Sequence, residues 1–168
     1  MANRIKLLPN IGANIAHLDF TVMLGDTAAN SDKMRPEDCG KAMKFATGLP
    51  DSRMVPCEDG DEINGQLQTV EATQTSAGFR VGTVRFINSP MFDAINKGTA
   101  DLAIGDEVVA ADQAAYGVAN FTPPYHVRML VKKAPAAVLG DPQRLKVVAI
   151  QSGTGATDSV VTLSRIMH

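Results

Sequence analysis

The sequence is poor in several features that mark particular classes of protein. It has no tryptophan, two tyrosines and two cysteines among 168 residues, and its formal net charge is only -2. A nearly balanced charge provides no broad cationic field for a phosphate backbone, so we expect no direct nucleic-acid partner. The unbroken apolar runs are a few residues long, whereas a membrane-spanning helix needs roughly 20 residues. We therefore expect no membrane partner either.

The amino-terminal residues lack the continuous apolar stretch of a secretory signal, because Pro9, Asn10 and Gly12 interrupt them. This pattern predicts synthesis in a cytoplasm. The two cysteines, Cys39 and Cys57, match neither a disulfide framework nor paired metal-binding knuckles. We expect both thiols to be reduced.

The length of the chain predicts one domain with its own core. Residues 1–30 mix short apolar groups with helix breakers, so we expect an extended N-terminal arm or edge segment there and a single β-rich domain over 31–168. A disordered terminus is the alternative. Branched apolar side chains at this density need to be covered. The candidate interface residues of the arm are therefore Leu7, Leu8, Ile11, Ile15 and Leu18.

Short apolar segments separated by turn residues dominate the rest of the chain. Pro36-Glu37-Asp38 is typical of the first turn of a helix. Alternating or β-branched residues predict strands over 41–47, 62–71, 79–86, 127–132, 145–150 and 159–166, and a valine strand follows the turn at Gly105-Asp106.

The turn residues between these segments predict how the strands connect. The second and third strands should form a hairpin, and so should the last two. A change of apolar phase near Gly82 indicates a bulge or burial on both faces. Residues 88–101 have the composition of a surface loop. The predicted fold is all-β, a small antiparallel β-barrel or sandwich with at most one or two short helical turns.

The order Gly-Asp-Glu followed by an apolar residue occurs twice, at 60–63 and 105–108. Turn-then-strand chemistry produces such short matches without duplication, so we interpret them as two similar turns rather than as an internal repeat.

Sequence motifs for catalysis and cofactor binding are missing. Gly40-Lys41 lacks the upstream glycine and downstream hydroxyl residue of a P-loop. The glycines at 153 and 155 begin like a dinucleotide-binding fingerprint, but Asp158 stands where the third glycine belongs. No serine lies in a Gly-x-Ser-x-Gly elbow. We expect a protein that is not an enzyme and that has no catalytic residue and no cofactor.

The scattered ionisable residues do not suggest a metal or catalytic site either. Asp59, Asp61 and Glu62 lack the order of a calcium-binding loop, so we expect a solvated turn and no metal ligands. The histidines, His17, His126 and His168, occur in unrelated settings. If a catalytic site were assembled from scattered residues, His126, Asp106 and Glu107 would be its least unlikely members.

Five local patterns follow one another from Asp38 to the carboxyl terminus. They are a glycine-marked series of strands with a Gly-Asp pair before a valine strand, at residues 38–44, 62–71, 78–84, 102–110 and 147–153. In this order they resemble the head decoration, or capsid cement, proteins of tailed bacteriophages.

This resemblance implies a virion structural protein on the outer surface of the expanded capsid, synthesised in the host cytoplasm. It would cement neighbouring capsid subunits against the pressure of packaged DNA, with many weak contacts acting together. Its partners would be the major capsid protein and further copies of itself, in a trimer or another small ring. The N-terminal arm would add a strand to the edge of a neighbour's sheet.

Two other classes of β-rich protein remain as alternatives at this point. One is a different phage particle component, such as a tail or spike subunit, and the other is a carbohydrate-binding module. Carbohydrate sites usually present exposed aromatic side chains, and a chain without tryptophan offers few of them.

Overall fold

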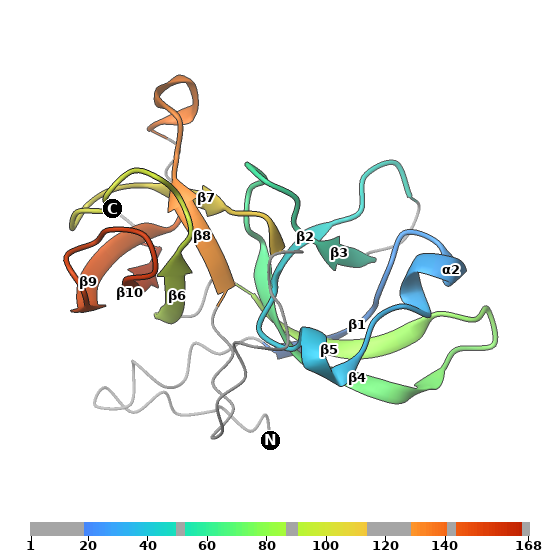
Figure 1. The fold of residues 1–168 in the computed structure, drawn as a ribbon. Coiled ribbons are helices and arrows are strands. Elements are labelled where there is room, and N and C mark those ends of the chain that lie inside the picture. Colours follow the sequence, from blue (N-terminus) through green and yellow to red (C-terminus); the bar gives the residue numbers. More distant parts are fainter. Residues whose placement is uncertain (1–18, 50–52, 87–90, 114–128, 141–143, 166–168) are drawn as a thin grey trace, which may run out of the picture.

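The structure is a computed structural model that describes residues 19–49, 53–86, 91–113, 129–140 and 144–165. These residues form ten strands in two five-stranded sheets (Figure 1). The short helical elements among them include α2 (Ala28–Ser31), η2 (Pro36–Asp38) and η5 (Ala136–Val138). The predicted all-β fold is confirmed. In the described part of the chain neither sheet closes into a barrel, so the sandwich form fits.

The first sheet has the strand order β1-β5-β4-β2-β3 and is antiparallel throughout. Its strands are β1 (Asp19–Met23), β2 (Ala42–Phe45), β3 (Met54–Pro56), β4 (Gly65–Gln74) and β5 (Arg80–Phe86). Strands β4 and β5 form the predicted hairpin, and η2 is the predicted helical turn at Pro36.

The irregularity expected near Gly82 lies on the neighbouring strand. Relative to its partner β5, strand β4 has extra residues between Leu67 and Thr69 and again between Val70 and Gln74. Strand β5 has no extra residue relative to β4. Gly82 is required for a different reason. A Cβ there would collide with the carbonyl oxygen of Thr69 and would lie 2.7 Å from the Leu24 side chain.

The second sheet has the strand order β7-β8-β6-β10-β9. Strands β6 and β8 are parallel, and the other neighbours are antiparallel. The strands are β6 (Phe92–Asn96), β7 (Val108–Ala110), β8 (Met129–Lys133), β9 (Lys146–Ser152) and β10 (Val160–Ser164). The predicted carboxyl-terminal hairpin is confirmed as β9 and β10.

The expectation of a surface loop over 88–101 is wrong for residues 92–96. They form β6, between β8 and β10 in the middle of the second sheet. Phe92, Ala94 and Asn96 are buried at every second position. This alternation is not recognisable in the sequence, because Asn96 is polar. An amide side chain is buried only where it has hydrogen-bond partners, and only the folded chain supplies them.

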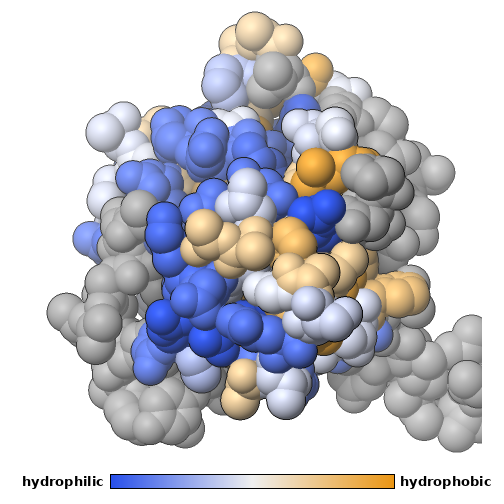
Figure 2. All heavy atoms as spheres, turned by 90° about the vertical axis from the view of Figure 1, so that its right-hand side faces the viewer, coloured by the Kyte–Doolittle hydropathy of each residue, from blue (hydrophilic) through white to orange (hydrophobic). Residues whose placement is uncertain are grey.

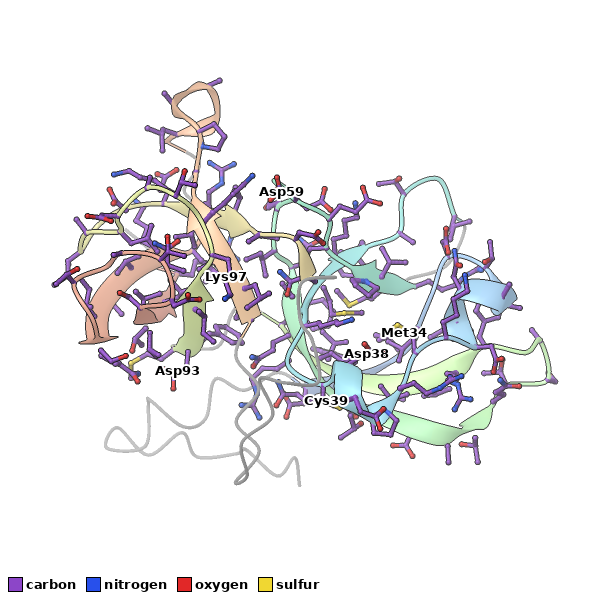
Figure 3. All side chains as sticks on the ribbon, in the orientation of Figure 1. Met34, Asp38, Cys39, Asp59, Asp93 and Lys97 are labelled. Atoms are coloured by element: carbon purple, nitrogen blue, oxygen red, sulfur yellow. The ribbon has the colours of Figure 1, made fainter. Side chains whose placement is uncertain are left out.

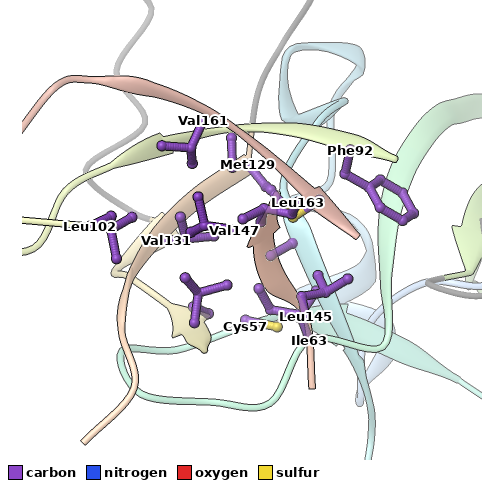
Figure 4. Close-up of a cluster of buried hydrophobic side chains, with 14 residues drawn as sticks. Cys57, Ile63, Phe92, Leu102, Met129, Val131, Leu145, Val147, Val161 and Leu163 are labelled. Atoms are coloured by element: carbon purple, nitrogen blue, oxygen red, sulfur yellow. The ribbon is translucent and has the colours of Figure 1, made fainter. Parts of the chain in front are cut away.

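Two clusters of buried side chains hold the molecule together. One belongs to the first sheet and consists of Leu24, Met34, Met43, Met54, Leu67 and Val84. The larger cluster combines residues from both sheets: Cys57 and Ile63, which flank the turn between β3 and β4, pack with Leu145 and the inner side chains of the second sheet (Figure 4). The two sheets therefore share the larger cluster.

A buried glutamine adds a polar link between the sheets. The Gln113 Oε1 atom accepts a hydrogen bond from the N–H of Ala42 in β2 at 3.1 Å. Its Nε2 donates to the carbonyl of Leu130 in β8 at 2.7 Å. Because Gln113 is almost fully buried, these bonds fix the relative position of β2 and β8 without competition from water.

The predicted arm lies partly outside the described residues. That part is 1–18, and it includes all five candidate interface residues: Leu7, Leu8, Ile11, Ile15 and Leu18. From Asp19 the same segment belongs to the fold, because it forms the edge strand β1 and then the helical turn α2.

Candidate interaction surface

The residues considered for a scattered catalytic site have other roles where the structure describes them. His126 lies outside the described residues, as do the other two histidines. Asp106 pairs with Lys133 at 2.8 Å. Glu107 is buried, pairs with Arg144 at 3.2 Å and accepts a hydrogen bond from the Gly140 N–H at 3.0 Å. Both carboxylates therefore hold loops in place.

The repeated Gly-Asp-Glu sequence forms the same turn twice. Gly60 and Gly105 adopt φ values of +90° and +94°, a region that favours glycine. The Asp61 carboxylate accepts a hydrogen bond at 2.6 Å from the N–H of Glu58, three residues before it. Asp106 makes the same bond to the residue three positions before it, at 2.8 Å. Both matches are thus turn chemistry, as the sequence indicated.

Each of these turns is also attached to a buried strand residue in the same way. The Gly60 N–H donates to the Ala110 carbonyl and the Ala110 N–H donates to the Asp61 carbonyl, both at 2.9 Å. Gly105 and Asp106 make the equivalent pair of bonds with Val147, at 2.8 and 2.9 Å. The first turn thereby connects the two sheets.

Ion pairs reinforce the two turns. Lys44 pairs with Asp61 at 2.6 Å, and this hydrogen bond raises the pKa of Lys44 above its ordinary value. Partial burial opposes ionisation of Asp106, but the hydrogen bonds from Lys133 and the Ala103 N–H outweigh it and lower the pKa of Asp106. At the exposed end of the first turn, Asp59 reaches Lys132 of β8 at 2.5 Å (Figure 3).

Neither cysteine has the properties of a reactive nucleophile. Both are free thiols, Cys57 buried and Cys39 half-buried. Burial raises the pKa of the Cys57 thiol to about 12. Burial is also the largest of the effects that raise the pKa of Cys39. Both thiols are therefore protonated at neutral pH, in which form they are poor nucleophiles.

A groove of about 630 Å³ lies beside α2 and β3. Three lysines and three carboxylates line it, and two of its lysines are already paired, Lys41 with Asp38 and Lys44 with Asp61, both at 2.6 Å. The side of the molecule that faces the viewer in Figure 2 is mostly hydrophilic, with a narrow hydrophobic strip across it. The groove therefore presents no concentration of one charge that would select a ligand.

Three of the six phenylalanines gather at one exposed end of the first sheet. The ring of Phe86 in β5 lies 5.2 Å from Phe20 in β1, edge to face, and 5.5 Å from Phe45 in β2. Phe20 is the register partner of buried Val84, so this aromatic row continues the apolar face of the sheet. Phe20 and Phe45 remain 49% and 40% exposed.

The aromatic row, Phe20, Phe86 and Phe45, is an apolar surface that sequence reasoning missed. The three residues come from strands that are far apart in the sequence, so no local pattern brings them together. The only sequence signal is that each is an aromatic residue at or near the end of an apolar strand segment. Their proximity depends on the strand order of the sheet.

Comparison of the chain with models of protein families, with curated proteins and with solved structures gave no match. Among the described residues no group of three or more His, Cys, Asp or Glu side chains is arranged to hold a metal ion. No helix in the described ranges is long and apolar enough to span a membrane. The described chain is an all-β protein of two five-stranded sheets with large apolar side chains exposed at its surface.

Proposed function

We propose that this chain is a virion structural protein that binds the outer surface of the expanded phage capsid and cements neighbouring capsid subunits. The turns at Gly60 and Gly105 and the ion pairs beside them hold the two sheets together as one rigid unit, which we call the frame. The observation that carries the proposal is that large apolar side chains remain exposed on this frame. Those side chains are Phe20, Phe45, Met91, Ile104 and Leu139. Phe20 and Phe45 form a contiguous apolar patch with Phe86, and such a patch is typical of a surface that contacts another protein.

The resemblance to decoration proteins supports the same function. Its five patterns fall on the elements that build the frame: η2 with β2, then β4, β5, the second Gly-Asp-Glu turn with β7, and β9. The same two turns brace the frame where the sheets meet and where β7 approaches β9. A cement protein needs such rigidity, because many small contacts act together only if each copy keeps its shape.

Binding to purified shells tests the proposal directly. The full chain is mixed with emptied, expanded heads that lack it, and bound protein is measured by sedimentation. We expect binding that saturates at a copy number set by the lattice, together with a higher temperature of shell disruption. Unexpanded shells serve as the control and should bind less.

Failure to sediment with the expanded heads, or binding that never saturates, would overturn the proposal. Saturable binding to purified tails instead of heads would favour a tail or spike subunit. Binding to immobilised glycans without shell binding would favour a carbohydrate-binding module.

A further inference from the structure

The groove beside α2 and β3 combines half-buried apolar residues with exposed polar ones. Its half-buried apolar residues are Ala46, Leu49, Val55 and Pro56. Its exposed polar residues include Asp26, Thr27, Asn30, Lys33 and Glu58. On the side of the molecule that carries α2, Figure 2 shows a narrow hydrophobic strip between hydrophilic side chains. An apolar centre within a polar rim is the usual composition of a protein–protein contact.

The polar groups of this groove already have partners within the molecule. Two of its lysines are paired with carboxylates. The third, Lys33, donates a hydrogen bond to the Oδ1 atom of Asn30 at 3.2 Å. The Asp26 carboxylate accepts hydrogen bonds from the Thr27 N–H and the Asn30 side chain, both at 2.8 Å. A charged occupant would therefore meet both signs of charge, whereas an uncharged apolar segment would cover the apolar residues and leave these bonds intact.

The loop from Ala134 to Gly140 is an exposed segment without a polar side chain. Its sequence is Ala-Pro-Ala-Ala-Val-Leu-Gly. Pro135, Ala136, Ala137 and Leu139 are exposed, and 53% of Leu139 is accessible. The loop contains η5 and projects from the second sheet beyond the rest of the described residues (Figure 1). It is therefore a convex apolar feature of the surface.

Both ends of this loop are fixed by Glu107. The backbone carbonyl of Glu107 accepts a hydrogen bond from the Ala134 N–H at 2.8 Å. Its carboxylate accepts one from the Gly140 N–H at 3.0 Å. Glu107 is itself buried and pairs with Arg144 at 3.2 Å. A loop that is fixed before binding loses little conformational entropy on association, which favours binding through a small contact.

We propose that the loop 134–140 of one copy of this chain binds in the groove of a second copy. The two surfaces match, because the loop is apolar and uncharged and the charges of the groove are already paired or hydrogen-bonded. The loop lies on the second sheet and the groove on the first, so a copy does not fill its own groove (Figure 1). Each copy uses both surfaces, in a head-to-tail contact that closes into a ring if the rotation allows. The inference goes beyond the proposed function and concerns copies in solution.

The contact is small, so we expect reversible association. One loop in a groove lies below the standard interface of about 1,600 Å². Sedimentation equilibrium of the full chain from about 1 μM to about 1 mM covers the range in which weak complexes dissociate. We expect monomer at the low end and larger species at the high end. Monomer throughout this range would overturn the inference.

Substitutions on either surface test whether the two surfaces form the contact. Leu139→Asp and Ala137→Asp place a charge on the loop, and Leu49→Asp and Thr47→Arg place one in the groove. Each should weaken association at least about tenfold. Ile104→Asp is the matched control, because Ile104 is 70% exposed but belongs to neither surface, and it should leave association unchanged. Far-UV circular dichroism identifies the variants that keep the fold. Unchanged association of folded variants of both surfaces would overturn the inference.

A mixture of variants tests the head-to-tail arrangement. Leu139→Asp keeps an intact groove and Leu49→Asp keeps an intact loop, so an equimolar mixture can form one complete contact per pair. At the high end of the concentration range we expect a heterodimer in the mixture and monomer in each variant alone. No association in the mixture would overturn the pairing of loop with groove.

Shell binding separates this inference from the proposed function. If Leu139→Asp lost binding to expanded heads but associated like the unsubstituted chain, the loop would contact the capsid and the inference would be overturned. Saturable shell binding by variants that no longer associate would leave the proposed function intact. Association of the unsubstituted chain without shell binding would support the loop contact and count against the proposed function.

Discussion

Asn96 is the buried polar residue that ties two loops of the second sheet to β6, and Asn96→Ala tests that role. Its amide nitrogen donates to the carbonyls of Gly155 at 2.8 Å and Ala100 at 3.0 Å. Its Oδ1 accepts from the Gly98 N–H at 2.9 Å. The side chain is fully buried, so alanine would leave these three backbone groups without their partners.

The expected cost follows from how far water can replace those bonds. A buried polar group left without a partner costs about 1–3 kcal/mol. Gly155 is buried and incurs this cost in full, whereas Gly98 is half-buried and Ala100 is exposed, so water can reach their backbone groups. We expect the free energy of unfolding to fall by about 2–4 kcal/mol, which corresponds to a Tm lower by roughly 5–15 °C.

Urea denaturation followed by far-UV circular dichroism, with calorimetry for the Tm, measures this effect. The matched control is Asn64→Ala. The Asn64 side chain accepts a single exposed hydrogen bond, from the Phe45 N–H at 3.1 Å, so its loss should cost less than about 1 kcal/mol. If the two variants were equally stable, or if Asn96→Ala cost less than about 1 kcal/mol, the reasoning about the buried amide would be wrong.

Three further predictions concern single positions. Gly155→Ala should destabilise the protein by about 3 kcal/mol or more, because the new Cβ would collide with the backbone of Leu102. Gly48→Ala is the control in the same denaturation assay: Gly48 also has a positive φ but lies in open space, so the substitution should cost about 1 kcal/mol. Folding lowers the pKa of Asp106, so this carboxylate stabilises the protein fully above its ordinary pKa of 3.8, and the stabilisation is lost as the pH falls through its lower pKa in the folded state. In Asp106→Asn, the free energy of unfolding should therefore fall less steeply at acid pH. Cys57, with its thiol buried and its pKa raised to about 12, should react with a thiol reagent only at the rate of unfolding; fast labelling in native buffer would contradict its burial.

The described frame connects stability with the proposed function. The turn at Gly60 and Asp61 bonds to β7, Asp59 pairs with β8, and Gln113 bonds to both β2 and β8. Polar bridges thus surround the apolar cluster that the two sheets share. Substitutions in these bridges should lower the thermal stability of the protein and leave the exposed apolar side chains unchanged. Shell binding and thermal stability can therefore be measured as separate effects.

The sequence by itself determined the all-β class and most of the strands. Turn residues and period-two alternation are local properties, and they located the β4–β5 and β9–β10 hairpins and the helical turn at Pro36. The two Gly-Asp-Glu turns were also recognisable, because a glycine at positive φ followed by a capping aspartate acts within four residues.

Only the tertiary structure decided the features that join distant segments. Strand β6 was missed because Asn96 counts as a loop residue until the carbonyls of Ala100 and Gly155 surround its amide. The aromatic row follows from strand order, since Phe20, Phe86 and Phe45 meet only when β1 lies beside β5. Strand order is set by which faces bury most apolar surface together, and that is a property of the whole chain rather than of any segment.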